Sequence, residues 1–379
     1  MILRGKTARH LLLLVMAASF CAAPFQRAAE AAKKKPATEQ EQIEASVKRE
    51  KVIGDKVAKE IEKAMKFVED PIVTARVQAL FNRLTPWVDR PLPYSIHVVR
   101  EKAPNAFCIP GGYIYVTTGL LDFVKSDAEL AYVVAHELVH ADGKHGIIQL
   151  ERNQKLSLAA LAVAIASKGA GAALVLSNVA AMAVSNAYSR DLERSADMGA
   201  LKILENAGYP LTAAVTVMES LAEEDLRQPW YDPGIALDHP KIAERVAYII
   251  DSVKERGCKI QRKTVLNLLR PSMALEKDSL ILRIDDTELF RGAKDQPGLR
   301  DYMEKAAAEI QGALQMETSP YDIRVAARYE GIPSLYVGIT RIMSSPIPGV
   351  QANFDEIRAR VLQALMEARK KNPVADYNG

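Results

Sequence analysis

The stretch "AYVVAHELVHADGKHG" at residues 131–146 combines an apolar helical pattern with three of the chain's six histidines. His136 and His140 stand at positions i and i+4, so a helix projects both side chains from one face, about 6 Å apart along its axis. Two neutral imidazoles at this spacing can bind one Zn²⁺, and Glu137 beside them can reach a water on the metal. The stretch therefore predicts a helix that carries part of a zinc site.

A catalytic zinc takes three protein ligands and keeps one position open, so a third ligand must come from elsewhere in the chain. His145 is one candidate, but it lies one residue before the last histidine of the pattern H-E-x-x-H-x-x-G-x-x-H, which turns its side chain out of line. Glu193, in "YSRDLERSADMG" (188–199), is the other candidate. It can bind the metal from a second helix, while Asp197 one turn later accepts the second N–H of a ligating histidine. Glu193 is the preferred third ligand.

Three segments occur in a characteristic order and spacing: "NAFCIPGGYIYVTTGLL" (105–121), "AHELVHADGKH" (135–145) and "SRDLERSAD" (189–197). In these segments the chain resembles metallopeptidase family forty-eight, the HtpX-like and CAAX-prenyl endopeptidase group, and in particular its exported bacterial periplasmic members. The resemblance extends over about residues 40–255. It implies one Zn²⁺ per chain, polypeptide substrates, and the following roles: metal ligands His136, His140 and Glu193, general base Glu137, and Asp197 as partner of a ligand.

Two further segments are similar to parts of the same family. "DHPKIAERV" (238–246) matches its later His-Pro segment. His239 there is a candidate for stabilising the oxyanion, or for occupying the open zinc position and blocking the enzyme; Arg245 could serve the same catalytic site. His239-Pro240 is equally explained as a plain helix start. "GGYIYVTT" (111–118) resembles the strand beside a metallopeptidase cleft, where an extended peptide can add as a further strand, although an ordinary core strand explains it too.

The first 31 residues predict a secretory signal peptide, because basic residues precede an apolar run at 11–20 that is short for a membrane span. The expected location is therefore the periplasm or cell envelope. A retained N-terminal anchor is an alternative, and so is a lipoprotein at Cys21, which the bulky Phe20 disfavours. Without residues 1–31 the net charge is zero, which gives no electrostatic reason to expect a nucleic-acid partner.

The hydrophobic patterns predict an α+β fold in two domains after a linker at 32–40. A mainly helical, gluzincin-type zinc metallopeptidase domain with a small β-sheet is expected over 41–258. A small C-terminal α+β domain follows over 260–379, with no group of residues that suggests chemistry, so it is expected to bind a protein partner or to pack. Its expected strands are 279–284, 323–329 and 335–342, and its expected helices are 297–315 and 351–370.

The Ala-rich segment 156–187 predicts a helical hairpin, buried or in peripheral contact with a membrane surface, in preference to a membrane span. Two cysteines remain in the expected exported chain, Cys108 and Cys258, and they could form one disulfide. Neither feature changes the expected chemistry.

The predicted function is a zinc-dependent endopeptidase of protein quality control, which hydrolyses misfolded or extended cell-envelope proteins. Metal-activated water would attack the peptide bond, with Glu137 taking its proton and later giving it to the leaving amine. The chain has no G-x-S-x-G motif that would favour a serine nucleophile. The alternative is an envelope chaperone or assembly factor with a latent zinc site, in which residues 260–379 do the main work.

Overall fold

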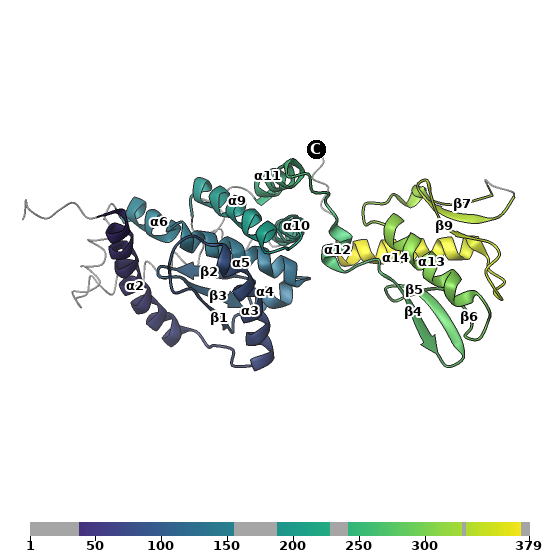
Figure 1. The fold of residues 1–379 in the computed structure, drawn as a ribbon, viewed down its shortest axis with the longest axis horizontal. Coiled ribbons are helices and arrows are strands. Elements are labelled where there is room, and N and C mark those ends of the chain that lie inside the picture. Colours follow the sequence, from purple (N-terminus) through teal and green to yellow (C-terminus); the bar gives the residue numbers. More distant parts are fainter. Residues whose placement is uncertain (1–37, 155–187, 228–241, 328–330, 373–379) are drawn as a thin grey trace, which may run out of the picture. The chain divides into compact units, whose positions relative to one another are not determined.

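The computed structural model describes residues 38–154, 188–227, 242–327 and 331–372 (Figure 1). The predicted signal peptide and the predicted hairpin at 156–187 lie outside these ranges. No helix within them combines the length and the apolar character that a membrane span requires. The α+β fold class is confirmed, because helices predominate and the described strands form small sheets.

Helix α2 (Glu39–Ala64) begins inside the segment expected to be a linker. Thr38 is the reason, because its Oγ1 accepts a hydrogen bond from the Glu41 N–H at 3.2 Å and its own N–H donates to the Glu41 carboxylate at 2.8 Å. This reciprocal capping box satisfies N–H groups of the first turn, so the helix begins directly after Thr38. The linker prediction for residues 32–40 is therefore wrong at Glu39 and Gln40.

The first sheet contains β1 (Ser95–Val99), β2 (Ala106–Ile109) and β3 (Tyr113–Thr117) in the order β1-β3-β2. Strand β3 pairs in parallel with β1 and antiparallel with β2. Strand β2 was not expected from the sequence. Because both sides of β3 are already paired, the prediction that a peptide adds as a strand along "GGYIYVTT" is wrong, and in this sheet only β1 and β2 are edge strands.

Helix α5 (Asp127–Asp142) holds the centre of this region. It contacts β2 and β3 of the sheet as well as the helices α9 (Arg190–Asn206) and α10 (Thr212–Arg227) (Figure 1). Its first turn is capped by Ser126, whose Oγ accepts from the Glu129 N–H at 3.3 Å. Most residues of α5 are buried, so the polar side chains among them must find partners inside the protein.

The other helices of this region complete the layer around α5. They are α3 (Pro71–Leu84), η1 (Thr85–Trp87), α4 (Thr118–Phe123), α6 (His145–Gln154), α11 (Ile242–Glu255) and α12 (Arg262–Leu266). Helix α11 contacts α9 and α10, and α3 contacts α5 and β1. Helix α10 was not expected from the sequence.

The C-terminal part repeats one arrangement twice: a three-stranded antiparallel meander followed by a helix. The first unit is β4 (Pro271–Glu276), β5 (Ser279–Ile284), β6 (Thr287–Ala293) and α13 (Leu299–Ala313), and the second is η3 (Pro320–Asp322), β7 (Ile323–Ala326), β8 (Ser334–Val337), β9 (Thr340–Ser344) and α14 (Phe354–Lys371). In both units the pairing shifts register between the second and third strands. Helix α13 packs on β4 and β9, and α14 packs on β7 and β6, so each helix covers strands of both units.

These two units share an apolar core of their own, which includes Leu282, Leu335 and Val361, separate from the core around α5. The change of core falls within α12, since Val265 belongs to the first core and Leu266 to the second. A separate core is what a second domain requires, and the boundaries at 41–258 and 260–379 stay a prediction.

The expected strand at 335–342 is in fact two strands, β8 and β9. Gly338 between them has φ +57°, a left-handed conformation that turns the chain back into a hairpin. The expected strand at 323–329 is β7, which ends at Ala326. Strands β4 and β6 were not expected.

Candidate metal centre

Helix α5 places His136, Glu137 and His140 in the interior, where all three are buried. The i, i+4 spacing brings the Nε2 atoms of the two histidines to 3.0 Å from each other. Both Nε2 atoms therefore face the same point, as two ligands of one metal ion would.

Helix α9 adds Glu193 to this point. Its Oε2 lies 3.6 Å from His136 Nε2, and its Oε1 lies 3.5 Å from His140 Nε2. The ligand atoms of His136, His140 and Glu193 all lie within 4.8 Å of one another, so these three buried residues could hold a metal ion. Two histidines and one glutamate make a donor set typical of a catalytic zinc with an open position.

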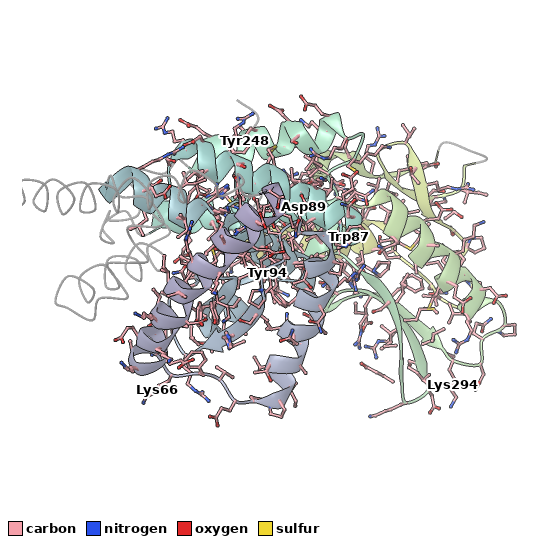
Figure 2. The ribbon with its side chains drawn as sticks, turned by 60° about the vertical axis from the view of Figure 1, so that its left-hand side comes forward. Lys66, Trp87, Asp89, Tyr94, Tyr248 and Lys294 are labelled. Carbon is pink, nitrogen blue, oxygen red and sulfur yellow. The ribbon has the colours of Figure 1, made fainter. Side chains whose placement is uncertain are left out.

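Asp197, one turn after Glu193, holds the other nitrogen of His136: its Oδ1 lies 3.0 Å from His136 Nδ1. It also accepts hydrogen bonds from the hydroxyls of Tyr132, at 2.7 Å, and Tyr248, which is labelled in Figure 2. The sequence analysis did not identify these tyrosines. Tyr132 precedes His136 by four residues, a spacing that places both on one helix face and could have revealed it.

Arg245 on α11 joins the same group. Its Nη1 lies 2.8 Å from Glu193 Oε2, its Nη2 lies 2.7 Å from Asp197 Oδ1, and its Nε donates to Asp197 Oδ2 at 2.9 Å. The guanidinium therefore binds both carboxylates, through the same oxygens, Glu193 Oε2 and Asp197 Oδ1, that face His136. His239, the other residue proposed for catalysis from the His-Pro segment, lies outside the described residues.

His145 is not among the three clustered ligands. Its Nδ1 lies 3.0 Å from Nδ1 of His140, the nitrogen that points away from Glu193. The ring of Tyr188 stacks on His140 with centroids 4.0 Å apart and planes at 20°. No sequence pattern pointed to Tyr188.

Burial and charge set the protonation of the cluster. Burial lowers the pKa of His140 to about 3 and raises the pKa of Glu137 to about 7. Burial also acts on His136, but its hydrogen bonds to Asp197 and Glu193 outweigh this and raise its pKa to about 10. Against burial, the hydrogen bonds of His136 and the charge of Arg245 keep the pKa values of Glu193 and Asp197 below their usual range. The ionised carboxylates thus favour a cation where the Nε2 atoms meet.

One oxygen of Glu137 supports the same assignment. Glu137 Oε2 is buried and has no hydrogen-bond partner among the described residues. A buried carboxylate oxygen without a partner is costly in a closed protein interior, and a water beside a metal ion would satisfy it. The residues present therefore fit a catalytic metal.

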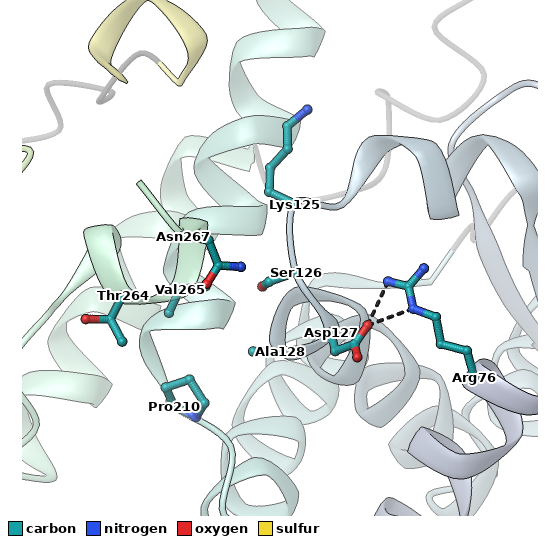
Figure 3. A pocket seen from close by; sticks show the side chains of 9 residues that line it. All are labelled: Arg76, Lys125, Ser126, Asp127, Ala128, Pro210, Thr264, Val265 and Asn267. Atoms are coloured by element: carbon teal, nitrogen blue, oxygen red, sulfur yellow. Dashed lines mark hydrogen bonds and ion pairs between the residues drawn. The ribbon is translucent and has the colours of Figure 1, made fainter. Parts of the chain in front are cut away.

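A separate surface pocket of about 480 Å³ opens at the N-terminal end of α5 (Figure 3). Two of its lining residues, Arg76 and Asp127, form an ion pair 2.7 Å apart. The pocket shares no residue with the His136, His140 and Glu193 cluster, so it takes no part in the candidate site.

Comparisons with known proteins find relatives among peptidases. The model of peptidase family M48 matches residues 71–252. The beta-barrel assembly-enhancing protease of Escherichia coli is 23% identical over 287 residues, which cover 73% of this chain and 58% of that protein. The mitochondrial metalloendopeptidase OMA1 of Arabidopsis thaliana is 36% identical over 132 residues, covering 35% and 26%. The metalloprotease LoiP of Escherichia coli is 28% identical over 195 residues, covering 49% and 71%.

Several of these relatives are much longer than their matched parts. The chain spans 43% of the length of a Vibrio cholerae relative and 42% of a Yersinia pestis relative, both named for beta-barrel assembly. The matched region nevertheless contains α5, α9 and most of α11, and so every described residue of the cluster. The family model and the relatives thus agree that residues 71–252 of this chain belong to peptidase family M48.

Proposed function

We propose that the chain is a zinc-dependent endopeptidase that cleaves misfolded or extended polypeptides. The observation that carries the proposal is the meeting of His136, His140 and Glu193 from two helices, with Glu137 beside them. A metal-binding group alone would be a structural site, whereas an adjacent buried carboxylate with one unpaired oxygen supports hydrolysis.

A zinc ion bound there would supply a Lewis acid that polarises the scissile carbonyl and lowers the pKa of water. The described residues do the rest. Glu137, with a pKa near neutrality, can take a proton from the attacking water and give it to the leaving amine. Asp197 orients His136, and Tyr132 and Arg245 hold Asp197.

Arg245 has a different role in this proposal from the one that the sequence suggested. Since its guanidinium binds Glu193 and Asp197, we propose that it positions the ligands and does not contact the substrate. A role for His239 in stabilising the oxyanion or in blocking the metal stays a prediction.

The proposed location is the periplasm or cell envelope, and the proposed substrates are envelope proteins. The signal-peptide pattern at residues 1–31 supports export, and two relatives named for beta-barrel assembly support a substrate class in the envelope.

Casein hydrolysis by the zinc-loaded protein tests the proposal. We expect cleavage by the wild type, and no cleavage by Glu137→Gln with zinc content unchanged, because the amide cannot accept the proton. Glu129→Gln is the matched control: it makes the same change at a buried glutamate of the same helix, and it should cleave normally. Equal cleavage by wild type and Glu137→Gln would rule out this mechanism.

The separate core of the C-terminal part favours a second candidate, an assembly factor or chaperone with a latent zinc site. Glu137→Gln separates the two functions in the intact protein. An endopeptidase loses its cellular function with this substitution, while a chaperone retains it.

A further inference from the structure

We propose that His145 is a positioning residue of the metal centre: its ring accepts a hydrogen bond from the Nδ1–H of His140 and so keeps His140 Nε2 directed at Glu193. The proposal rests on the metal site of the proposed function and assigns a role to a histidine outside the ligand set.

Both proposed ligand histidines have a neighbouring group close to Nδ1. His136 Nδ1 lies 3.0 Å from a carboxylate oxygen of Asp197, and His140 Nδ1 lies 3.0 Å from His145 Nδ1. Each histidine thus has Nε2 toward the cluster and a separate group 3.0 Å from Nδ1, and of the two contacts only that of His140 has hydrogen-bond geometry. Such partners fix the tautomer and the orientation of a ligating ring.

The chain turns sharply to place His145 there. Helix α5 ends at Asp142, Gly143 caps it, Lys144 adopts φ +55°, and α6 starts at His145. The reversal folds the His145 ring back over the end of α5. A Cβ atom on Gly143 would lie 2.5 Å from His145 Nε2, so the glycine leaves the space that the ring occupies.

Stacking alone does not give His140 its orientation. Tyr188 covers the face of the ring and restrains its plane. A half-turn of the imidazole about its Cβ–Cγ bond leaves the ring in the same plane, so the stack stays almost unchanged while Nε2 exchanges place with Cε1 and Nδ1 with Cδ2. The contact between His140 Nδ1 and His145 exists in only one of the two orientations, so His145 distinguishes them.

The test measures zinc affinity by competition with a chelator, and it needs no activity. We expect His145→Leu to weaken zinc binding roughly 10–100-fold, the usual effect of removing such a partner. His145→Gln, whose amide oxygen can accept the hydrogen bond, should recover most of the affinity. His97→Leu makes the same change at a histidine outside the site and should bind zinc like the wild type.

A second variant, Gly143→Ala, tests the proposal independently in case His145→Leu does not fold. Gly143→Ala keeps the imidazole but displaces it, and should weaken zinc binding in the same direction. Far-ultraviolet circular dichroism of the metal-free variants shows whether they are folded. Wild-type zinc affinity in folded His145→Leu would overturn the proposal, and so would a loss that His145→Gln does not recover.

The outcome is independent of the proposed peptidase activity. If the wild type binds zinc but does not cleave casein, the proposed function fails while the affinity series still decides the role of His145. If the wild type cleaves casein and His145→Leu binds zinc normally, the endopeptidase stands and the role of His145 is refuted.

Discussion

Arg245 Nη1 lies 2.8 Å from Glu193 Oε2, so a guanidinium on α11 binds a proposed metal ligand directly. The same side chain binds Asp197, which in turn holds His136. Helix α11 therefore contributes to the centre through the positions of the ligands.

Arg245→Ala should destabilise the protein by about 3–5 kcal/mol, because it leaves Glu193 and Asp197 as buried charges without their main partner. Chemical denaturation of the metal-free protein measures the loss. Arg76→Ala is the control, since it breaks an exposed ion pair with Asp127 and should cost less than about 1 kcal/mol. Equal effects of the two substitutions would contradict the buried network.

Glu193→Gln should lose bound zinc on desalting, because a neutral amide replaces the charged ligand. Metal content by atomic emission measures this. Glu219→Gln changes another buried glutamate, one paired with Arg262 away from the cluster, and should retain one zinc per chain. Full zinc content in Glu193→Gln would remove Glu193 from the ligand set.

Gly199→Ala should weaken zinc binding through the packing of two helices. A Cβ atom on Gly199 of α9 would lie 2.8 Å from both methyl carbons of Val139 on α5, and these helices carry the three proposed ligands. Overpacking of this kind typically costs about 1–3 kcal/mol.

A double variant and a control make this test specific. Val139→Ala with Gly199→Ala makes room for the new methyl group and should restore zinc affinity. Gly312→Ala on α13 meets no atom within 4 Å and should be neutral or stabilising by up to about 1 kcal/mol. No rescue by the double variant would mean that the helix contact is not the cause.

Thiol labelling should separate the two cysteines in the part of the chain that the structure describes, neither of which forms a disulfide there: Cys258 is exposed and Cys108 is buried. The sequence had left a disulfide between them open. With iodoacetamide under native conditions, peptide mapping should find Cys258 labelled first and Cys108 labelled only after denaturation. Rapid labelling of both under native conditions would contradict the burial of β2.

Because of Lys263, the free energy of unfolding should change with pH in the alkaline range. Its buried ammonium donates to the carbonyls of Gln311 and Leu314, and burial lowers its pKa from 10.5 to about 8. Between these pH values the unfolded chain retains a proton that the folded protein has lost. The contribution of this group to the free energy of unfolding therefore rises with pH in that window.

The comparison of wild type with Lys263→Met from pH 7 to pH 10.5 checks this. The difference in unfolding free energy should move in favour of the wild type above about pH 8 and stay constant below it. Lys305→Met, at an exposed position on α13, gives the background slope. Parallel curves for the wild type and Lys263→Met would contradict the lowered pKa.

Much of the fold and of the cluster could be predicted from local patterns. The spacing of His136 and His140 depends only on helix geometry, and the structure brings Glu193 and Asp197 to them as the sequence analysis expected. Prediction failed where a strand's neighbours decide its role: "GGYIYVTT" has the composition of an edge or a central strand, and only the pairing of β3 on both sides distinguishes them.

The sequence by itself determined the α+β class and the helix that carries the paired histidines, because these follow from short-range periodicity. Only the tertiary structure decided that Arg245 binds the carboxylates, that Tyr132 and Tyr248 hold Asp197, and that His145 faces the far nitrogen of His140. These relationships depend on how helices distant in the chain cross and on the turn at Gly143 and Lys144, where long-range packing and backbone conformation set the direction of each side chain.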